Sequence, residues 1–275
     1  MIISGITIRN GQALYGAGIL NGGVLTVSRS ILVGNVAFER CVDRCSSISS
    51  GRGGAVFNTG TMIISNSTLT QNSASACRTI FLPMGRQIVC SGVGGGIWNN
   101  GTLTINNDTL SANDVGHQGS VGGGVFNVGG ILTVNNSTVS MNSGGGIFNE
   151  DTNGFGFTQG TATLQNAIVA NKGVNCEGPL IISMGYNLSS NGSCHFSNTG
   201  DRNNTNPKLG PLQNNGGPTQ TMALLPGSPA IDAGNPSGCT DGHGHLFKTD
   251  QRGKPRPDPE DTGGCDMGAY ESQGD

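Results

Sequence analysis

Charged residues are scarce in this chain of 275 residues: they make up 11% of it, and the net charge is only -3. A nucleic-acid-binding surface needs a concentration of lysine and arginine, so the composition argues against a nucleic-acid partner. No apolar run reaches the roughly 18 residues that a membrane-spanning helix requires. No window shows a sustained apolar stripe at the 3.6-residue spacing of an amphipathic helix, so helices should be rare.

Several chemical motifs are missing as well. No lysine of the Walker type follows the glycine runs, and no strand–G-x-G-x-x-G–helix unit is present, which argues against nucleotide binding. There is no G-x-S-x-G nucleophile elbow. The glycine runs lack the aspartate of calcium-binding nonapeptide repeats. The eight cysteines contain no C-x-x-C pair, so a zinc ribbon is not expected.

The cysteines instead fall into neighbouring groups, and their number favours an oxidising compartment. We expect two disulfides, Cys176–Cys194 and Cys239–Cys265. Two inserted loops hold the remaining four cysteines, for which local pairing and pairing between the loops both stay open: Cys41, Cys45, Cys77 and Cys90.

Glycine, with 48 residues, is abundant, and much of it lies in one repeated phrase. Five segments carry small residues, then an aliphatic residue, one further apolar residue and asparagine: 16–21 (GAGILN), 53–58 (GGAVFN), 94–99 (GGGIWN), 122–127 (GGGVFN) and 144–149 (GGGIFN). A run with apolar residues at every second position, such as Leu103-Thr104-Ile105, follows each segment and indicates a half-buried strand. The shortest step, from Gly122 to Gly144, is 22 residues, which is typical of a solenoid.

We therefore predict an all-β fold, a parallel β-helix in which equivalent positions stack from coil to coil. Residues 1–175 should form the coils, with inserted loops at 37–52, 74–93, 114–121 and 150–160. Residues 176–275 should form the final coils and a disulfide-stapled C-terminal cap. Recurring asparagines at the end of each phrase should form a hydrogen-bonded ladder: Asn21, Asn58, Asn99, Asn127 and Asn149. The Asn-x-Ser/Thr sequences at Asn66, Asn107 and Asn136 are better explained by turn chemistry than by glycosylation.

Three parts of the chain resemble one family. They are the opening Ile3–Gly11 (ISGITIRNG), the glycine-rich repeats, and a tail that contains Gly216–Gly234 (GGPTQTMALLPGSPAIDAG), Asp250–Gly253 (DQRG) and Cys265–Glu271 (CDMGAYE). They are similar to bacterial secreted and cell-surface proteins of the choice-of-anchor Q type, whose repeats resemble those of polymorphic outer membrane proteins. The resemblance implies a right-handed parallel β-helix and an extracellular or cell-surface location, without an agreed activity. Because Met1 starts within what reads as a coil, we expect the export signal to be missing from this chain.

An aromatic stripe is the candidate substrate-binding surface. If the aliphatic residue of each phrase points into the core, the next residue points outward, because neighbouring side chains of a strand face opposite sides. The insertions at 37–52, 74–93 and 114–121 should form a wall on one side of this stripe, and the insertion at 150–160 should form the other. Sugars stack on aromatic faces, but the rings could also stack on one another under the inserted loops. The candidate residues are Phe57, Trp98, Phe126 and Phe148.

Catalytic groups would have to come from the two walls. The candidates are Asp114 and His117 on one side and Glu150 and Asp151 on the other. A glycosidase needs two carboxyl groups about 5–9.5 Å apart. A lyase needs a base beside a uronate, with Ca²⁺ or arginine neutralising its carboxylate. Each of these residues could equally be an ordinary polar loop residue. No cofactor and no metal is otherwise expected, with Ca²⁺ as the alternative.

The tail holds two further groups of polar residues. One group should form arginine–carboxylate pairs that close the last coil, with a binding or catalytic cluster as the alternative: Asp250, Arg252, Arg256, Asp266 and Glu271. The other is Asp241, His243 and His245, whose spacing could place two imidazoles around a metal on a strand. A solvated loop explains this second group better.

Two functions follow from these features. The first is an exported surface module that binds a polysaccharide or cell-surface glycan or acts in adhesion. The alternative is a polysaccharide-degrading enzyme, a glycoside hydrolase or polysaccharide lyase, that uses the groove. Ice binding, which needs a flat face of repeated threonine, is disfavoured because Gly130 interrupts the row of Thr61, Thr102 and Thr161.

Overall fold

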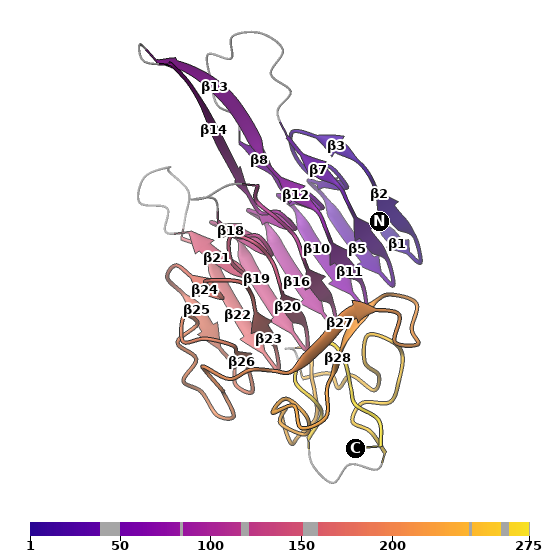
Figure 1. Ribbon diagram of the computed structural model, residues 1–275. Helices are drawn as coiled ribbons and strands as arrows, with labels where there is room; N and C mark the ends of the chain where they lie inside the picture. Colours follow the sequence, from indigo (N-terminus) through magenta and orange to yellow (C-terminus); the bar gives the residue numbers. More distant parts are fainter. Residues whose placement is uncertain are drawn as a thin grey trace.

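The computed structural model describes residues 1–38, 50–82, 85–116, 121–150, 159–241, 244–259 and 264–274, with only the backbone given over 76–82 and 85–91. The described residues form strands and turns, without an α-helix. None of them belongs to a helix long and apolar enough to cross a membrane. Three long parallel sheets stack coil upon coil, which confirms the all-β fold and the parallel β-helix (Figure 1).

Each coil contributes one strand to each of the three sheets. The groove sheet contains β4 (Ile19–Asn21), β9 (Val56–Asn58), β15 (Ile97–Asn99), β18 (Val125–Val128), β21 (Ile147–Glu150) and β24 (Cys176–Glu177). The threonine sheet contains β1 (Ile2–Ser4), β5 (Val24–Ser28), β10 (Thr61–Ser65), β16 (Thr102–Asn106), β19 (Ile131–Asn135), β22 (Thr161–Gln165) and β25 (Ile181–Ser183). The tail-facing sheet contains β2 (Thr7–Arg9), β6 (Ile31–Val33), β11 (Thr68–Thr70), β17 (Thr109–Ser111), β20 (Thr138–Ser140), β23 (Ile168–Ala170) and β26 (Leu188–Ser189).

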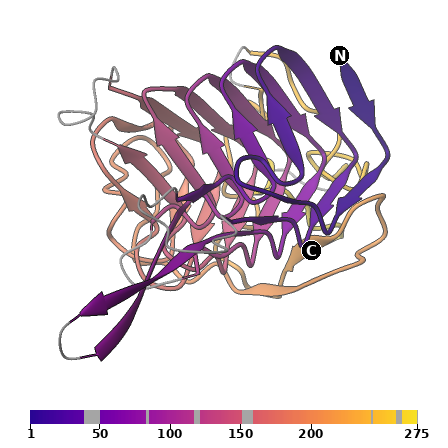
Figure 2. The same cartoon turned by 90° about the horizontal axis from the view of Figure 1, so that it is seen from above.

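Shorter strands complete the early coils and the tail. A three-stranded sheet holds β3 (Gln12–Ala13), β7 (Val36–Ala37) and β12 (Ser73–Ala74). The hairpin of β13 (Ala76–Leu82) and β14 (Gly85–Val93) projects from the stack, as Figure 2 shows, and pairs with β8 (Gly51–Arg52). The tail carries one antiparallel pair, β27 (Leu209–Gln213) and β28 (Thr221–Leu224).

The alternating runs place one side chain in two inside the coil. In β16, Leu103 and Ile105 are fully buried, whereas Thr102, the first residue of the strand, is exposed. Leu132 of β19 stacks in register on Leu103, and the same holds along the sheet. Burying each such aliphatic side chain contributes about 1.5–3 kcal/mol, so the column of apolar residues is the main source of stability.

Two asparagine ladders line the corners. In the first, each side-chain amide donates a hydrogen bond of 2.6–2.7 Å to the side-chain oxygen of the next coil, which confirms the predicted ladder: Asn21, Asn58, Asn99, Asn127 and Asn149. The second, with distances of 2.9 Å, uses the asparagines that close the repeats: Asn35, Asn72, Asn113, Asn142 and Asn171. The ladders give buried turn amides partners that water cannot supply.

The Asn-x-Ser/Thr sequences lie at a left-handed corner between the threonine sheet and the tail-facing sheet. Asn66, Asn107 and Asn136 have φ angles of 52°, 57° and 46°. Asparagine adopts this conformation more readily than most residues, because its short polar side chain bonds locally. The Asn107 and Asn136 side chains are buried and donate to backbone carbonyls of the tail. Turn chemistry, as predicted, therefore accounts for these motifs.

The tail, residues 206–274, lies along the side of the stack and is not confined to the last coil (Figure 1, orange to yellow). Near the last coils, Met267 packs with Ile168 in an apolar cluster. Farther back, the Gln251 side-chain amide donates to the Ser67 carbonyl at 3.1 Å and to the Thr68 hydroxyl at 2.9 Å. The predicted cap is thus a strap that spans several coils.

Both expected disulfides are present: Cys176–Cys194 in the last coils and Cys239–Cys265 in the tail. Residues Cys77 and Cys90 face each other in the backbone register of the β13–β14 hairpin, and Cys41 and Cys45 lie outside the described residues. Arginine–carboxylate pairs join Arg252 to Asp250 and Arg256 to Glu271, each at 2.7 Å and buried.

One expected feature of the threonine sheet is wrong. The residue in register with Thr102 and Thr161 is Ile131, and not Gly130. The reason is a longer turn: the segment from Asn127 to Ile131 has one residue more than the equivalent turn that starts at Asn99. No glycine interrupts the row.

Candidate functional site

The outward-facing residues of the groove sheet form a continuous aromatic row. The parallel register pairs Trp98 with Phe57 on one side and with Phe126 on the other, and Phe126 with Phe148. The Phe57 and Trp98 rings stack 4.2 Å apart at an angle of 4°. Those of Phe126 and Phe148 stack at 5.2 Å and 4°. These aromatic side chains point outward, as predicted, because their neighbours Ile97 and Val125 are buried in the core.

The centre of this row is covered, whereas its ends are partly open. The exposed fractions of Trp98 and Phe126 are only 4% and 6%. Both pack against Val93, Val121 and Val128 in a cluster separate from the main core. The centre thus fits the alternative in which the rings stack under neighbouring segments. Half-buried Phe57 and Phe148 remain partly accessible.

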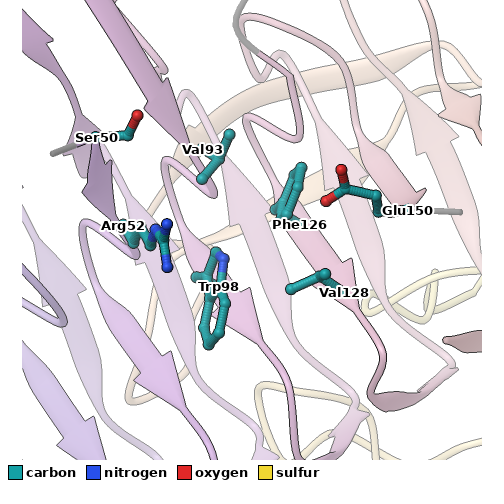
Figure 3. A pocket seen from close by; sticks show the side chains of 7 residues that line it. All are labelled: Ser50, Arg52, Val93, Trp98, Phe126, Val128 and Glu150. Atoms are coloured by element: carbon teal, nitrogen blue, oxygen red, sulfur yellow. The ribbon is translucent and has the colours of Figure 1, made fainter. Parts of the chain in front are cut away.

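A hollow of about 190 Å³ opens over the covered centre of the row (Figure 3). Its floor is formed by Trp98 and Phe126, and charged residues stand on opposite sides of it. Among the described residues its lining consists of Ser50, Arg52, Val93, Trp98, Phe126, Val128 and Glu150. Here the aromatic row meets charged side chains of both signs, which could bind a polar ligand.

Arg52 reaches the hollow from the short strand β8. The pairing of Gly51 and Arg52 with Gly92 and Val93 fixes its backbone beside the projecting hairpin. The guanidinium carbon lies 5.6 Å from the centre of the Trp98 ring and 5.8 Å from that of Tyr15, within the range of cation–π attraction. The side chain is therefore held over the aromatic floor, where its planar donors suit a carboxylate or a pair of hydroxyls.

Glu150 stands across the hollow at the end of β21. Figure 3 shows its carboxylate and the Arg52 guanidinium on opposite sides, with Trp98 and Phe126 between them. Burial raises the pKa of Glu150, and the positive charge of Arg52 partly opposes the rise. A carboxyl group with a raised pKa is a stronger base when ionised, and it stays protonated up to a higher pH.

The other predicted catalytic residues do not join this pair. Asp114 lies next to the short sheet, where its backbone bridges Ser73, and it is not among the residues that line the hollow. His117 and Asp151 lie outside the described residues. Glu150 is the one carboxylate among the described residues that line the hollow, and Glu177 lies next to it along the groove sheet, in register with Phe148.

Asp108 stands out among the copies, because Ser67 and Ser137 take its place in the neighbouring coils. Its fully buried carboxylate accepts hydrogen bonds from the backbone N–H groups of Ser67 at 2.6 Å and Asn106 at 2.9 Å. Burial raises its pKa well above the usual range. The side chain serves the corner and does not open into the groove.

In the part of the chain that the structure describes, no group of three or more histidine, cysteine, aspartate or glutamate residues is placed to hold a metal ion. In the tail, His245 pairs with Asp241 at 2.9 Å and is largely exposed, while His243 lies outside the described residues. These residues give no support to the Ca²⁺ alternative.

Arg52 was missed in the sequence, although a signal was present. When the copies are aligned on their glycine runs, Arg52 occupies the position of Val93 and Val121, just before the run. The structure shows these residues side by side: Val93 pairs with Arg52 and bridges Val121. A single arginine in an apolar column, adjacent to an aromatic row, is the feature that could have been noticed.

Comparison of this chain with models of known protein families, with curated proteins and with solved structures gives no match.

Proposed function

We propose that this protein is an exported surface module that binds a polysaccharide or cell-surface glycan along the groove sheet. The observation that supports this is the stacked aromatic row beneath a hollow flanked by Arg52 and Glu150. A sugar ring has an apolar face of C–H groups that packs on an aromatic ring, and hydroxyls at its rim that bond to charged groups. The hollow offers both kinds of contact within one site.

The volume of the hollow suits a sugar chain of which one unit enters the hollow. A hollow of about 190 Å³ is smaller than the roughly 300 Å³ or more of pockets that enclose drug-sized ligands. One ring would occupy it, and neighbouring rings would lie over half-buried Phe57 and Phe148. Coils repeat about every 4.8 Å, a step comparable with the length of one sugar unit.

Export is part of the same proposal. The two disulfides need an oxidising compartment to form and persist. Disulfides at this density are uncommon in the cytosol, so they support an extracellular or cell-surface location. The resemblance of the tail to bacterial surface proteins points to the same place.

The glycan proposal predicts which variants lose binding. Replacing Phe57 or Phe148 with alanine should weaken retention on immobilised polysaccharides about tenfold, because each ring contributes about 1 kcal/mol of stacking and its apolar contact area. Both rings are half-buried, so the fold should survive. The matched control is Ile131→Ala, which removes an exposed apolar side chain from the threonine sheet. Equal retention of all three variants would contradict the proposal.

A second function is favoured by the Arg52–Glu150 arrangement: lyase activity on uronate-containing glycans. Arg52 would neutralise the uronate carboxylate, and Glu150 would take the proton on the carbon beside it. The electron pair forms a carbon–carbon double bond, the glycosidic carbon–oxygen bond breaks, and water supplies a proton to the leaving oxygen. The raised pKa of Glu150 makes its carboxylate a stronger base than that of an ordinary glutamate.

The lyase is tested by mass spectrometry of soluble products from a panel of neutral and uronate polysaccharides. Activity should give oligosaccharides with unsaturated ends that drop by about 10²-fold or more in Glu150→Gln. The control is Asp232→Asn, which alters an exposed aspartate of the tail, outside the groove sheet. Unchanged products in Glu150→Gln, or a panel without products, would leave the binding function alone.

A further inference from the structure

The outer face of the threonine sheet is a second surface with an unusual composition. Five consecutive strands, β5, β10, β16, β19 and β22, each place two side chains on this face. All ten are β-branched, with seven threonines among them: Val24, Thr26, Thr61, Ile63, Thr102, Thr104, Ile131, Thr133, Thr161 and Thr163. This face carries neither charge nor aromatic ring in these two rows.

The two rows form a regular lattice. Each strand pairs with the next residue by residue, without a register shift. Neighbouring coils therefore repeat about every 4.8 Å, and the two residues of one strand lie about 6.6 Å apart. Figure 1 shows these strands side by side along the stack. The exposed fractions of Val24 and Ile131, 72% and 57%, show that the described chain leaves this face open to solvent.

The lattice is bounded by a third row of different chemistry. The outward positions at the end of the same strands carry hydroxyls or amides: Ser28, Ser65, Asn106, Asn135 and Gln165. There the Asn135 amide donates to the Asn106 side chain at 2.9 Å and to the Asp241 carbonyl of the tail at 2.7 Å. Contacts between this sheet and the tail thus begin at the third row, whereas Val24 and Ile131 of the first row are exposed to solvent.

We propose that these two rows are an ice-binding face. The surface of an ice crystal repeats in two dimensions, as the two rows do. The rows carry hydroxyl and methyl groups without charge, which suits a surface of ordered, uncharged water molecules. Threonine hydroxyls hydrogen-bond to water molecules, and the methyl groups of threonine, valine and isoleucine confine the water between them. In the row of Val24, Thr61, Thr102, Ile131 and Thr161, the position between Thr102 and Thr161 carries the methyl groups of Ile131 and not the bare backbone of Gly130.

Other occupants fit this face less well. In a face-to-face dimer, threonine hydroxyls would be buried against methyl groups, and unpaired buried hydroxyls destabilise an interface. A soluble sugar chain is recognised by aromatic rings and by charged or amide groups, which lie on the groove sheet instead. Water at the surface of an ice crystal can supply a partner for every hydroxyl of the two rows.

The proposal is tested by measuring thermal hysteresis and the inhibition of ice recrystallisation with the purified chain. The test variant is the double substitution Thr104→Lys and Thr133→Lys, which places two ammonium groups at the centre of the face. Because each ammonium keeps its own hydration shell, the concentration needed to stop ice growth should rise about tenfold or more. The control is Thr7→Lys at an exposed threonine of β2 in the tail-facing sheet, which should retain the activity. Both positions of the test variant lie on the surface, and circular dichroism verifies folding.

Three results would overturn the proposal. The first is a negative result of the ice assays: ice grows as fast with the native protein as with an inert protein at the same concentration, or the double lysine variant is as active as the native protein. The second is a dimer in sedimentation that the lysine pair dissociates, which would assign the face to a second copy. The third is sedimentation with microcrystalline cellulose that the lysine pair abolishes, which would assign it to a neutral crystalline glycan. None of these outcomes depends on Phe57, Arg52 or Glu150, so the glycan proposal stands or falls separately.

Discussion

Replacing Arg256 with methionine should lower the free energy of unfolding by about 3–5 kcal/mol, the usual consequence of removing one partner of a buried ion pair. The Arg256 guanidinium is buried and donates to the Glu271 carboxylate at 2.7 Å. It also donates to the Asn107 side-chain oxygen at 2.8 Å and to the Gly268 carbonyl at 2.9 Å. Its loss leaves a carboxylate without its cation beneath the tail and cuts a direct link between the tail and the coils.

Chemical denaturation, followed by circular dichroism, measures this effect. Arg9→Met, at an exposed arginine on β2, is the matched control and should change the free energy of unfolding by about 0.5 kcal/mol or less. The double variant Arg256→Met with Glu271→Met should recover much of the loss, because it leaves no buried charge unpaired. If Arg256→Met were as stable as Arg9→Met, neither the Arg256–Glu271 pair nor the Arg256–Asn107 bond would stabilise the fold.

The second large effect is a loss of stability as pH rises. Burial, and then the charge of Glu271, raise the pKa of Asp266 from 3.8 to about 7, although backbone N–H groups of Ser272 and Asp232 favour the ionised form. The folded state therefore holds a proton that the unfolded state releases. The stabilisation is complete below pH 3.8 and is lost as pH rises through about 7. At about 1.4 kcal/mol per pKa unit, the free energy of unfolding should fall by roughly 4 kcal/mol at most.

Denaturation curves collected from pH 4 to pH 8 test this expectation. The free energy of unfolding should decline across that interval, and Asp266→Asn should reduce the slope, whereas Glu177→Gln at an exposed position should keep it. The raised pKa values of Asp108 and Glu271 act in the same direction, so a residual slope should persist in the variant. Stability that rose with pH over this interval would show that Asp266 is ionised in the folded chain.

The sequence predicts the coil well because its determinants are local and periodic. Alternation fixed which side of each strand faces the core, as Leu103 and Ile105 show. The asparagine at the end of each phrase predicted a ladder, because stacking brings equivalent positions together. Because Cys176 and Cys194 are near each other in the sequence, the disulfide between them could be predicted.

Features that depend on distant contacts were not predictable in the same way. The strap along the coils arises from bonds such as that between Thr68 and Gln220, which are 152 residues apart. The sequence also left open whether the aromatic stripe is exposed or covered, and in the structure Val93 and Val121 of the returning insertions pack against the cluster of Trp98. Glu150 was selected from its place beside the stripe, but Asp114 was grouped with it only because both flank the insertions. The structure places Glu150 opposite Arg52 instead.

The most direct test of the glycan-binding groove uses Trp98, because it is the only tryptophan of the chain and lies in the floor of the hollow. Its fluorescence should be recorded while soluble oligosaccharides, both neutral and uronate-containing, are titrated into the protein. Binding in the groove predicts a saturable change in intensity or wavelength that requires a higher ligand concentration in Phe57→Ala and Phe148→Ala. An oligosaccharide that binds the protein, by calorimetry, without altering the Trp98 signal would place the glycan site elsewhere and contradict the account.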